Sequence, residues 1–377
     1  MEESEQKDRG TLLELHELRK EFDGFVAVED LHLTVEEGEF ICFLGPSGCG
    51  KTTTLRMIAG LETPTSGEIY LRGRRINDLI PQQRNMGLVF QNYALFWHMT
   101  VYDNLAFGLR IRGVSREGID KNVRDVAKRF ELEPLLKTRA RRLDLSAMQR
   151  VAVARTLLTD PHLLLFDEPL NNIRPGLREM LRAELKRLQK DLNRTMIYVT
   201  HDQEEAMTLG DRILVMNDGK VEQLDTPRQI YLHPKTLFVA DFIGRPSMNF
   251  MEMEYQRAGE KISLRWNGYE WNIERKDLDF EARHLKGKKL IVGVRPEHIL
   301  LAEETERAGV KAAPLFGVVD FVQPLGSKKI VDLKHGDHLV KMVTSSDFPL
   351  KRGDEISVIF HPRKIHLFNP KDGRAIL

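Results

Sequence analysis

The sequence predicts an α/β protein: a parallel sheet covered by helices comes first, and a small β-barrel or sandwich comes after it. From Leu12 to Leu209, strand-like and helix-like segments alternate. A glycine-rich loop, Gly45–Thr52, joins a short apolar strand to a helix. Near Phe242 the helical spacing fades and short β segments separated by turns begin. Alternation is typical of a parallel sheet buried on both faces, and closely spaced short strands are typical of a barrel or sandwich.

The apolar patterns of the first part place its elements in order. The chain is strand-like from Leu12 to Phe43, and its last stretch, FICFL, is an apolar run that ends in glycine, as a buried strand does when it feeds a loop. Residues 93–150 are richer in charge and helical spacing, which predicts an inserted helical subdomain. Further strands are expected at 68–73, 162–169 and 195–201, and helices at 52–61, 122–136, 150–158, 176–192 and 202–209.

The second part has the pattern of β structure throughout. Its expected strands lie within residues 261–268, 288–299, 316–326 and 354–368. We place the boundary at about residue 245, which gives one domain at 1–245 and a β-barrel domain at 246–377.

Composition and charge exclude several classes of protein. The chain has 377 residues, of which 41% are hydrophobic, so it can bury the cores of two or three domains. Its net charge of +1 argues against a nucleic-acid partner, which would require a basic excess. The polar N-terminus does not resemble a signal peptide, and no apolar run is long enough to span a membrane. Cys42 and Cys49 are expected to be free thiols.

The glycine-rich loop GPSGCGKT fits the phosphate-binding pattern G-x-x-x-x-G-K-[ST]. Glycines let successive backbone N–H groups point inward, and the helix after the loop directs its positive dipole end at the bound anion. Lys51 can reach the β- and γ-phosphates, and the Thr52 hydroxyl can bind Mg²⁺. The residues expected to bind ATP here are Gly45, Pro46, Ser47, Gly48, Cys49, Gly50, Lys51, Thr52 and Thr53. With the flanking strand and helix, this predicts a P-loop NTPase sheet.

Two carboxylates end the expected strand LLLFD. Asp167 would hold Mg²⁺ through water, and Glu168 would polarise the water that attacks the γ-phosphate. Asp-Glu-Pro alone would equally suit an ordinary strand-ending turn. The upstream phosphate loop favours the catalytic interpretation.

His201 and Gln91 also come directly after strands that are expected in the parallel sheet. Side chains at the carboxyl ends of such strands lie on the ligand side, so His201 could bind the γ-phosphate and hold Glu168. Gln91 could contact Mg²⁺ or the attacking water and report to a partner. The alternatives are a structural histidine and an ordinary polar strand end.

Four segments together resemble the ATP-binding subunits of ABC importers, especially the group for maltose, other sugars and glycerol phosphate. These segments are GPSGCGKTTTLRMIAGLE, VFQNYALF, LLLFDEPL and YVTHDQEEAM, and GVRPEHI resembles the C-terminal regulatory barrel of that group, an OB/TOBE-like domain. The resemblance covers nearly the whole chain.

The resemblance implies partners and a location. Two ATPase subunits would enclose two ATP molecules with Mg²⁺ and would drive two membrane permeases at the cytoplasmic face of the inner membrane, peripherally. A periplasmic or extracellular solute-binding protein would be an indirect partner. Phe22 matches the aromatic residue that stacks on adenine, and its alternative is a core phenylalanine. Polyamine and iron importers remain alternatives to sugar, polyol or glycerol-phosphate importers.

The segment LDLSAMQRVA departs from the family signature, LSGGQ followed by a glutamine-rich turn and RVA, and is two residues shorter. No glycine remains to let a partner's γ-phosphate approach the backbone. Ser146 and Gln149 retain the outer positions of the motif and are kept as candidate ATP contacts, although S-x-x-Q also fits an ordinary capping box.

Two further departures concern what this chain would present to other subunits, the first to the partner ATPase and the second to the membrane subunits. Asn171 and Arg174 replace the usual serine and aspartate after DEPL, and Trp97 stands where the family usually has proline. These changes predict a heterodimer with a second ATPase that has an intact signature, although a homodimer or a weakly catalytic regulatory subunit stays open. A soluble ABC ATPase of DNA repair or translation is less consistent, because the chain has neither a long coiled coil nor a duplicated cassette.

Overall fold

The computed structural model describes residues 10–90, 92–171, 173–258, 261–274, 289–304 and 313–376. The chain divides into two compact units after Pro227, and each is described by itself. Within the described residues, no helix is long and apolar enough to cross a membrane.

The first unit contains a largely parallel sheet with the strand order β10-β9-β3-β8-β7-β6. All neighbouring strands pair in parallel except β10, which pairs antiparallel with β9 at one edge. The strands are β3 (Phe40–Leu44), β6 (Met86–Val89), β7 (Leu163–Asp167), β8 (Thr195–Thr200), β9 (Arg212–Asn217) and β10 (Lys220–Asp225). Every residue of β3 and β8 is buried, as expected for central strands covered on both faces.

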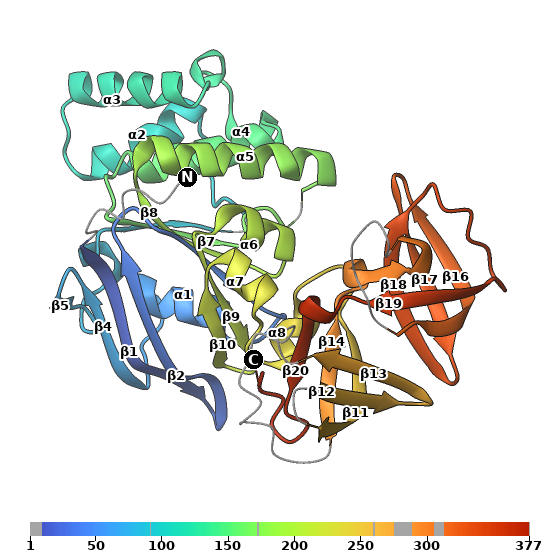
Figure 1. The fold of residues 1–377 in the computed structure, drawn as a ribbon. Coiled ribbons are helices and arrows are strands. Elements are labelled where there is room, and N and C mark those ends of the chain that lie inside the picture. Colours follow the sequence, from blue (N-terminus) through green and yellow to red (C-terminus); the bar gives the residue numbers. More distant parts are fainter. Residues whose placement is uncertain are drawn as a thin grey trace. The chain divides into compact units, whose positions relative to one another are not determined.

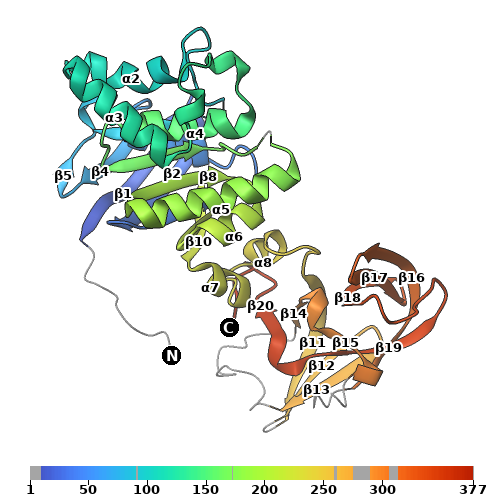
Figure 2. The same ribbon diagram turned by 90° about the horizontal axis from the view of Figure 1, so that it is seen from above.

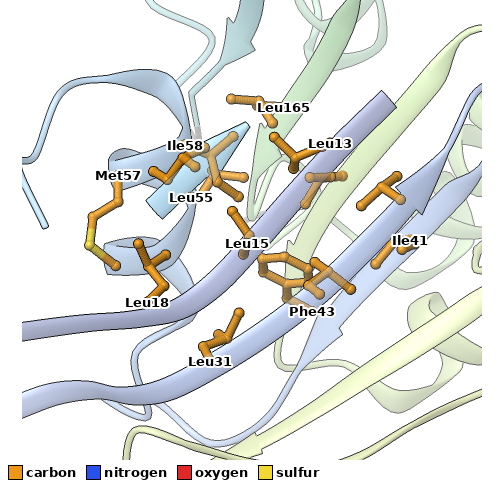
Figure 3. Close-up of a cluster of buried hydrophobic side chains, with 14 of the residues drawn as sticks. Leu13, Leu15, Leu18, Leu31, Ile41, Phe43, Leu55, Met57, Ile58 and Leu165 are labelled. Atoms are coloured by element: carbon orange, nitrogen blue, oxygen red, sulfur yellow. The ribbon is translucent and has the colours of Figure 1, made fainter. Parts of the chain in front are cut away.

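A second, antiparallel sheet uses the N-terminal strands and has the order β2-β1-β4-β5. Its strands are β1 (Thr11–Phe22), β2 (Phe25–Glu36), β4 (Ser66–Leu71) and β5 (Arg74–Arg75). Helix α1 (Lys51–Ala59) packs between this sheet and the parallel one (Figure 1). In the shared core, Leu15 of β1 and Phe43 of β3 lie beside Leu55 of α1 (Figure 3).

The remaining helices of the first unit are α2 (Val101–Ile111), α3 (Arg116–Arg129), α4 (Leu145–Leu157), α5 (Pro175–Leu192) and α6 (Gln203–Leu209), with short 3-10 turns at Pro81–Gln83, Glu133–Leu135 and Ala140–Arg142. Figure 2 shows α2, α3 and α4 grouped at one end of this unit, where the helical subdomain was predicted.

Helix α3 differs from its prediction at residues 122–136. It begins six residues earlier because the Ser115 hydroxyl accepts a hydrogen bond from the N–H of Gly118 and caps the helix. It ends at Arg129, because Glu131 adopts a left-handed backbone (φ 53°) before a 3-10 turn that contains Pro134.

The second unit begins at Arg228 within α7 (Pro227–Leu232), includes α8 (Leu237–Phe242) and continues as β structure. One sheet has the order β13-β12-β11-β14-β20 and the other the order β15-β19-β16-β17-β18. Their strands are β11 (Asn249–Ala258), β12 (Lys261–Trp266), β13 (Tyr269–Glu274), β14 (Lys289–Val294), β15 (Ile299–Leu301), β16 (Leu315–Leu325), β17 (Lys328–His335), β18 (His338–Ser345), β19 (Glu355–Phe360) and β20 (Ile365–Phe368), with 3-10 turns at Pro296–His298, Ala302–Glu304 and Pro362–Lys364.

Both of these sheets contribute to one hydrophobic core, in which Trp271 is fully buried and contacts the ring of Phe360 edge-on. The prediction of an α/β sheet with a small β domain after it is confirmed. The compact units divide after Pro227, and this division does not test where the domain boundary lies. The boundary at residue 245 therefore stays a prediction.

Candidate active site

The phosphate loop lies between β3 and α1, where the sequence predicted it. Two of its glycines are required by close backbone packing. A Cβ at Gly45 would collide with the carbonyl oxygen of Met216, and one at Gly50, whose φ is +100°, would collide with that of Ala27. Any side chain at Gly45 or Gly50 would therefore force the loop open.

Lys51 is 4% exposed, and its ammonium lies inside the loop. It donates hydrogen bonds to the carbonyl oxygens of Gly45 at 2.8 Å and Pro46 at 2.7 Å. Its Nζ also lies 3.6 Å from the sulfur of Cys49. The lysine thus holds a positive charge at the centre of the curled backbone, where phosphate oxygens would bind.

The other loop residues differ in exposure. Ser47 and Gly48 lie exposed at the tip of the loop, whereas Cys49 is 3% exposed. Cys42 and Cys49 are both buried free thiols, as predicted, and burial raises the pKa of each. The accessible tip leaves room for a ligand above the buried lysine.

Thr52 and Asp167 lie next to each other although 115 positions separate them in the sequence. The Thr52 hydroxyl donates a hydrogen bond to Oδ1 of Asp167 at 2.8 Å. Burial raises the pKa of Asp167, while this hydrogen bond and the charge of Arg56 oppose the rise. Within the described residues, no group of three or more His, Cys, Asp or Glu side chains could hold a metal. One hydroxyl and one carboxylate nevertheless fit Mg²⁺, which is usually bound by few protein oxygens together with phosphates.

Glu168 is fixed by both its backbone and its side chain. Its φ is +46°, in the left-handed region, and its N–H donates to the carbonyl oxygen of Val199 at 3.0 Å. Its Oε2 lies 3.3 Å from Nδ1 of His201, so the structure brings together the two residues that the sequence paired. The Glu168 side chain is 20% exposed and His201 is 43% exposed, which leaves both accessible to a ligand.

Two contacts around this carboxylate were not predicted from the sequence. Asn171 donates its amide N–H to the same Glu168 oxygen at 3.0 Å. The Tyr93 hydroxyl donates to the carbonyl oxygen of Pro169, the next residue, at 3.0 Å, and burial raises the pKa of Tyr93 to about 12. Asn171 stands out in the sequence as a departure from the family, but nothing in its spacing reveals this contact. Gln91, the predicted partner of Mg²⁺ or water, lies outside the described residues.

Phe22 is not a core residue. It ends β1, is 41% exposed, and has the Lys20 ammonium 4.6 Å from its ring centroid. Phe25 pairs with it across the hairpin and is 63% exposed. The second strand of this hairpin packs on the phosphate loop, since Ala27 lies against Gly50. An exposed aromatic ring on this hairpin is consistent with the predicted adenine contact, which stays a prediction.

The altered signature forms the start of α4 but not in the predicted way. Asp144 caps the helix by accepting a hydrogen bond from the N–H of Ala147 at 2.7 Å, so the segment is an ordinary capped helix, but its cap is Asp144 and not the alternative capping box at Ser146 and Gln149. Ser146 already lies in the first turn and is 8% exposed. Gln149 is 2% exposed, and neither atom of its buried amide has a hydrogen-bond partner among the residues that the structure describes.

Gln149 lies against α5 instead of at the surface. With Arg150, Glu184 and Leu181 it lines a small cavity of ≈ 10 Å³ between α4 and α5. A buried amide cannot reach a nucleotide on another subunit without moving, so the geometry argues against Gln149 as an ATP contact in this conformation.

Family models match three parts of the chain. An ABC transporter model matches residues 28–171, a MalK OB fold domain matches 244–299, and a TOBE domain matches 292–368. The chain is 42% identical to the sn-glycerol-3-phosphate import ATP-binding protein UgpC of Vibrio vulnificus (strain CMCP6), over 96% of this chain and 95% of that protein.

The chain belongs to the ABC transporter ATP-binding proteins. It is also 42% identical to the trehalose/maltose import ATP-binding protein MalK of Thermococcus litoralis, over 95% of this chain and 97% of that protein. Its C-terminal β unit matches domains named for this group, which confirms the predicted OB/TOBE-like domain.

Solved structures resemble the ATPase part of this ABC protein. CbiO1 from Clostridium perfringens, described as part of the ABC transporter complex cbiONQ, is 28% identical with a TM-score of 0.55, covering 58% of this chain and 90% of that one. The ATP-binding cassette MJ0796, described as a dimer bound to ADP and Pi, is 31% identical with a TM-score of 0.51, covering 58% of this chain and 99% of that one. The phosphate loop, Asp167, Glu168 and His201 thus lie in an ABC ATPase fold.

Proposed function

We propose that this chain is the ATP-hydrolysing subunit that energises an importer for a sugar, a polyol or a glycerol phosphate. One observation carries the proposal. Beside the phosphate loop, the Thr52–Asp167 pair at 2.8 Å and the Glu168–His201 pair at 3.3 Å lie at the carboxyl ends of neighbouring parallel strands. The names of the UgpC and MalK relatives support import and the solute class. Polyamine and iron importers are the alternatives.

The proposed roles derive from these positions. The loop N–H groups and Lys51 would bind the phosphates, and Glu168 would orient and polarise the attacking water. His201 would hold the Glu168 carboxylate through Nδ1. Thr52 and Asp167 would hold Mg²⁺, which neutralises the charge on the phosphate oxygens when it is bound.

A Glu168→Gln variant tests the catalytic assignment. ATP affinity, measured with a fluorescent ATP analogue, should be unchanged, because the phosphate loop is untouched. Turnover should fall by about 100-fold or more, as expected when a general base is removed. Glu179→Gln, which changes an exposed glutamate of α5, is the matched control and should hydrolyse normally. Normal turnover by Glu168→Gln would contradict the assignment.

The proposed location is the cytoplasmic face of the membrane, where two permease subunits would hold the chain peripherally. Trp97 supports a docking surface near the loop that begins after Gln91, because this large aromatic side chain is 47% exposed. A solute-binding protein outside the membrane would act on this subunit only through the permeases.

The partner in the ATPase dimer is proposed to be a second ATPase with an intact signature. The burial and unpaired amide of Gln149 support this, because this chain then offers little to an ATP bound by its partner. Its own phosphate loop, Glu168 and His201 are complete, so one composite site would hydrolyse ATP and the opposite site would bind it and turn over slowly. A homodimer with weak hydrolysis is the alternative.

Turnover of the chain alone, and then with added partner ATPase, separates these alternatives. We expect low hydrolysis alone and a large increase with the partner. A variant with Gly-Gly in place of Ala147 and Met148, and with two glutamines inserted after Gln149, should restore turnover to the lone chain. Strong hydrolysis by the unmodified lone chain would refute the heterodimer.

A further inference from the structure

We propose that Asn171 is a positioning residue for hydrolysis, which together with His201 holds one oxygen of the Glu168 carboxylate and leaves the other to the attacking water. This rests on the proposed role of Glu168. Asn171 Nδ2 lies 3.0 Å from Oε2 of Glu168, and His201 Nδ1 lies 3.3 Å from the same atom. Because both contacts fall on Oε2, the carboxylate cannot rotate without losing them, and Oε1 is held in one direction.

The backbone around Glu168 adds to this restraint. The N–H of Asn171 donates to the Glu168 carbonyl oxygen at 3.3 Å, so the two residues close a tight turn. Glu168 itself has φ +46°, a conformation that is unfavourable for a non-glycine residue and persists only when its surroundings fix it. The short Asn171 side chain therefore reaches back over a rigid turn to the carboxylate.

Arg178, in α5, hydrogen-bonds to the chain near both residues that contact Glu168, Asn171 and His201. Its Nη2 donates to the carbonyl oxygens of Asn171 at 3.2 Å and Ile173 at 3.3 Å, and its Nη1 donates to Oδ2 of Asp202 at 2.9 Å. Asp202 comes directly after His201 and caps α6 by accepting hydrogen bonds from the first backbone N–H groups of that helix. One guanidinium thus fixes the loop that carries Asn171 and the turn that carries His201.

These groups enclose a small space beside Glu168. A cavity of ≈ 10 Å³ is lined by Glu168, Asn171, Arg178, Thr200, His201, Asp202 and Glu205. The side chains thus lie close around the carboxylate, although His201 keeps 43% of its side chain exposed. The two contacts to Oε2 are what hold the carboxylate in one orientation.

The chain supplies a matched control in Arg182. This residue lies one turn after Arg178 on α5, is 8% exposed, and also bridges to α6 through Glu204 at 3.3 Å. Both of its terminal nitrogens donate to Glu204. Arg178→Met and Arg182→Met each remove an α5–α6 bridge, but only the first releases the two carbonyl groups beside Glu168.

Hydrolysis is measured with the full-length chain in excess over MgATP, so that a single turnover is followed even when hydrolysis is slow. Asn171→Leu keeps the volume and removes the donor, and it should slow hydrolysis by about 10- to 100-fold, the effect of losing one hydrogen bond to a charged group. Asn171→Asp should slow it further, because a carboxylate would face Glu168. Arg178→Met should also slow it and Arg182→Met should not. The affinity for a fluorescent ATP analogue should stay within about twofold in all four.

Asparagine-selective ¹⁵N NMR tests the contact without any hydrolysis. The Asn171 side-chain amide protons should shift when Glu168 is changed to Ala and should be little affected in Arg182→Met. If the Asn171 amide protons keep the same chemical shift in Glu168→Ala, the proposal is overturned. Normal hydrolysis by Asn171→Leu would also overturn it. If the signal shifts as expected but the wild-type protein never hydrolyses ATP, even with an added partner ATPase that has an intact signature, the proposed function is refuted, and the positioning role with it.

Discussion

Arg295 belongs to the segment GVRPEHI, and the structure gives it a role that predicts a large loss of stability on mutation. The side chain is 1% exposed, and it donates hydrogen bonds to the carbonyl oxygens of Ile243 at 2.6 Å and Tyr231 at 2.7 Å. Its guanidinium lies 3.9 Å from the centroid of the Tyr231 ring. It thereby fastens the segment that carries α7 and α8 to the end of β14, within the second unit.

The change Arg295→Met keeps much of the apolar stem and removes every one of these contacts. Two hydrogen bonds from a charged donor contribute about 1.5–3 kcal/mol each, and the cation–π contact about 2 kcal/mol when desolvated. Against this stands the cost of burying the charge, several kcal/mol, which also lowers the pKa of Arg295 to about 10. Since two buried carbonyl groups lose their donors, we expect a net loss of about 2–4 kcal/mol.

Tryptophan fluorescence during urea unfolding can follow this unit. Of the three tryptophans, Trp266 and Trp271 are buried in the second unit, so a Trp97→Phe background isolates their signal. With a slope of about 1–3 kcal/mol per molar urea, the midpoint should fall by about 0.7–4 M. Arg265→Met is the control: this half-exposed arginine pairs with Glu270 at the surface and should cost under about 1 kcal/mol. Equal midpoints for the two variants would refute the reasoning.

Two further predictions concern the first unit. Glu205 is 2% exposed and its Oε2 accepts hydrogen bonds from Tyr198 and Thr200, yet burial raises its pKa above 4.5. Protonated Glu205 therefore stabilises the fold fully below pH 4.5, and this stabilisation is lost as the pH rises through the pKa of the folded protein. Glutamine cannot ionise, so in urea titrations Glu205→Gln should gain stability relative to wild type from pH 4.5 toward pH 7. A difference in unfolding free energy between Glu205→Gln and wild type that stays constant from pH 4.5 to pH 7 would contradict this prediction. Tyr93→Phe should cost about 0.5–1.5 kcal/mol, because the carbonyl oxygen of Pro169 loses its donor; no loss in the same titration would show that the hydrogen bond contributes nothing.

Short sequence motifs predicted those parts of the site whose residues are neighbours in the sequence. The run FICFL and its glycines placed the phosphate loop, and LLLFDEP placed Asp167 and Glu168 at a strand end. The pairing of Glu168 with His201 was also predictable, because parallel neighbours bring their carboxyl ends to one edge.

Contacts that depend on side-chain direction could not be predicted in this way. The amide of Asn171 contacts Glu168 across a turn in which Glu168 adopts a left-handed backbone, a conformation that no residue type near it requires. Tyr93 reaches Pro169 across 76 positions of sequence. The alternative capping box at Ser146 does not form because Asp144, two residues before it, is an equally good cap and takes that role.

The burial of Gln149 has a geometric explanation in the shortened signature. An α-helix turns by about 100° per residue, so two residues fewer before Arg150 rotate the upstream turn by about 200° relative to the rest of the helix. Because α4 is continuous from Leu145 to Leu157, no loop within it can absorb this rotation. Downstream, Val151, Ala152 and Val153 are buried and fix the helix in place.

The upstream turn must therefore present a different face, and Gln149 enters the contact with α5. The same shortening that removes the glycines thus also turns the remaining polar side chain inward. Restoring two residues after Gln149 rotates that turn back by about 200°, which is why we expect the insertion variant to return the amide to the surface. Replacing Ala147 and Met148 by glycines without the insertion should leave Gln149 buried, and turnover of the lone chain should then stay low.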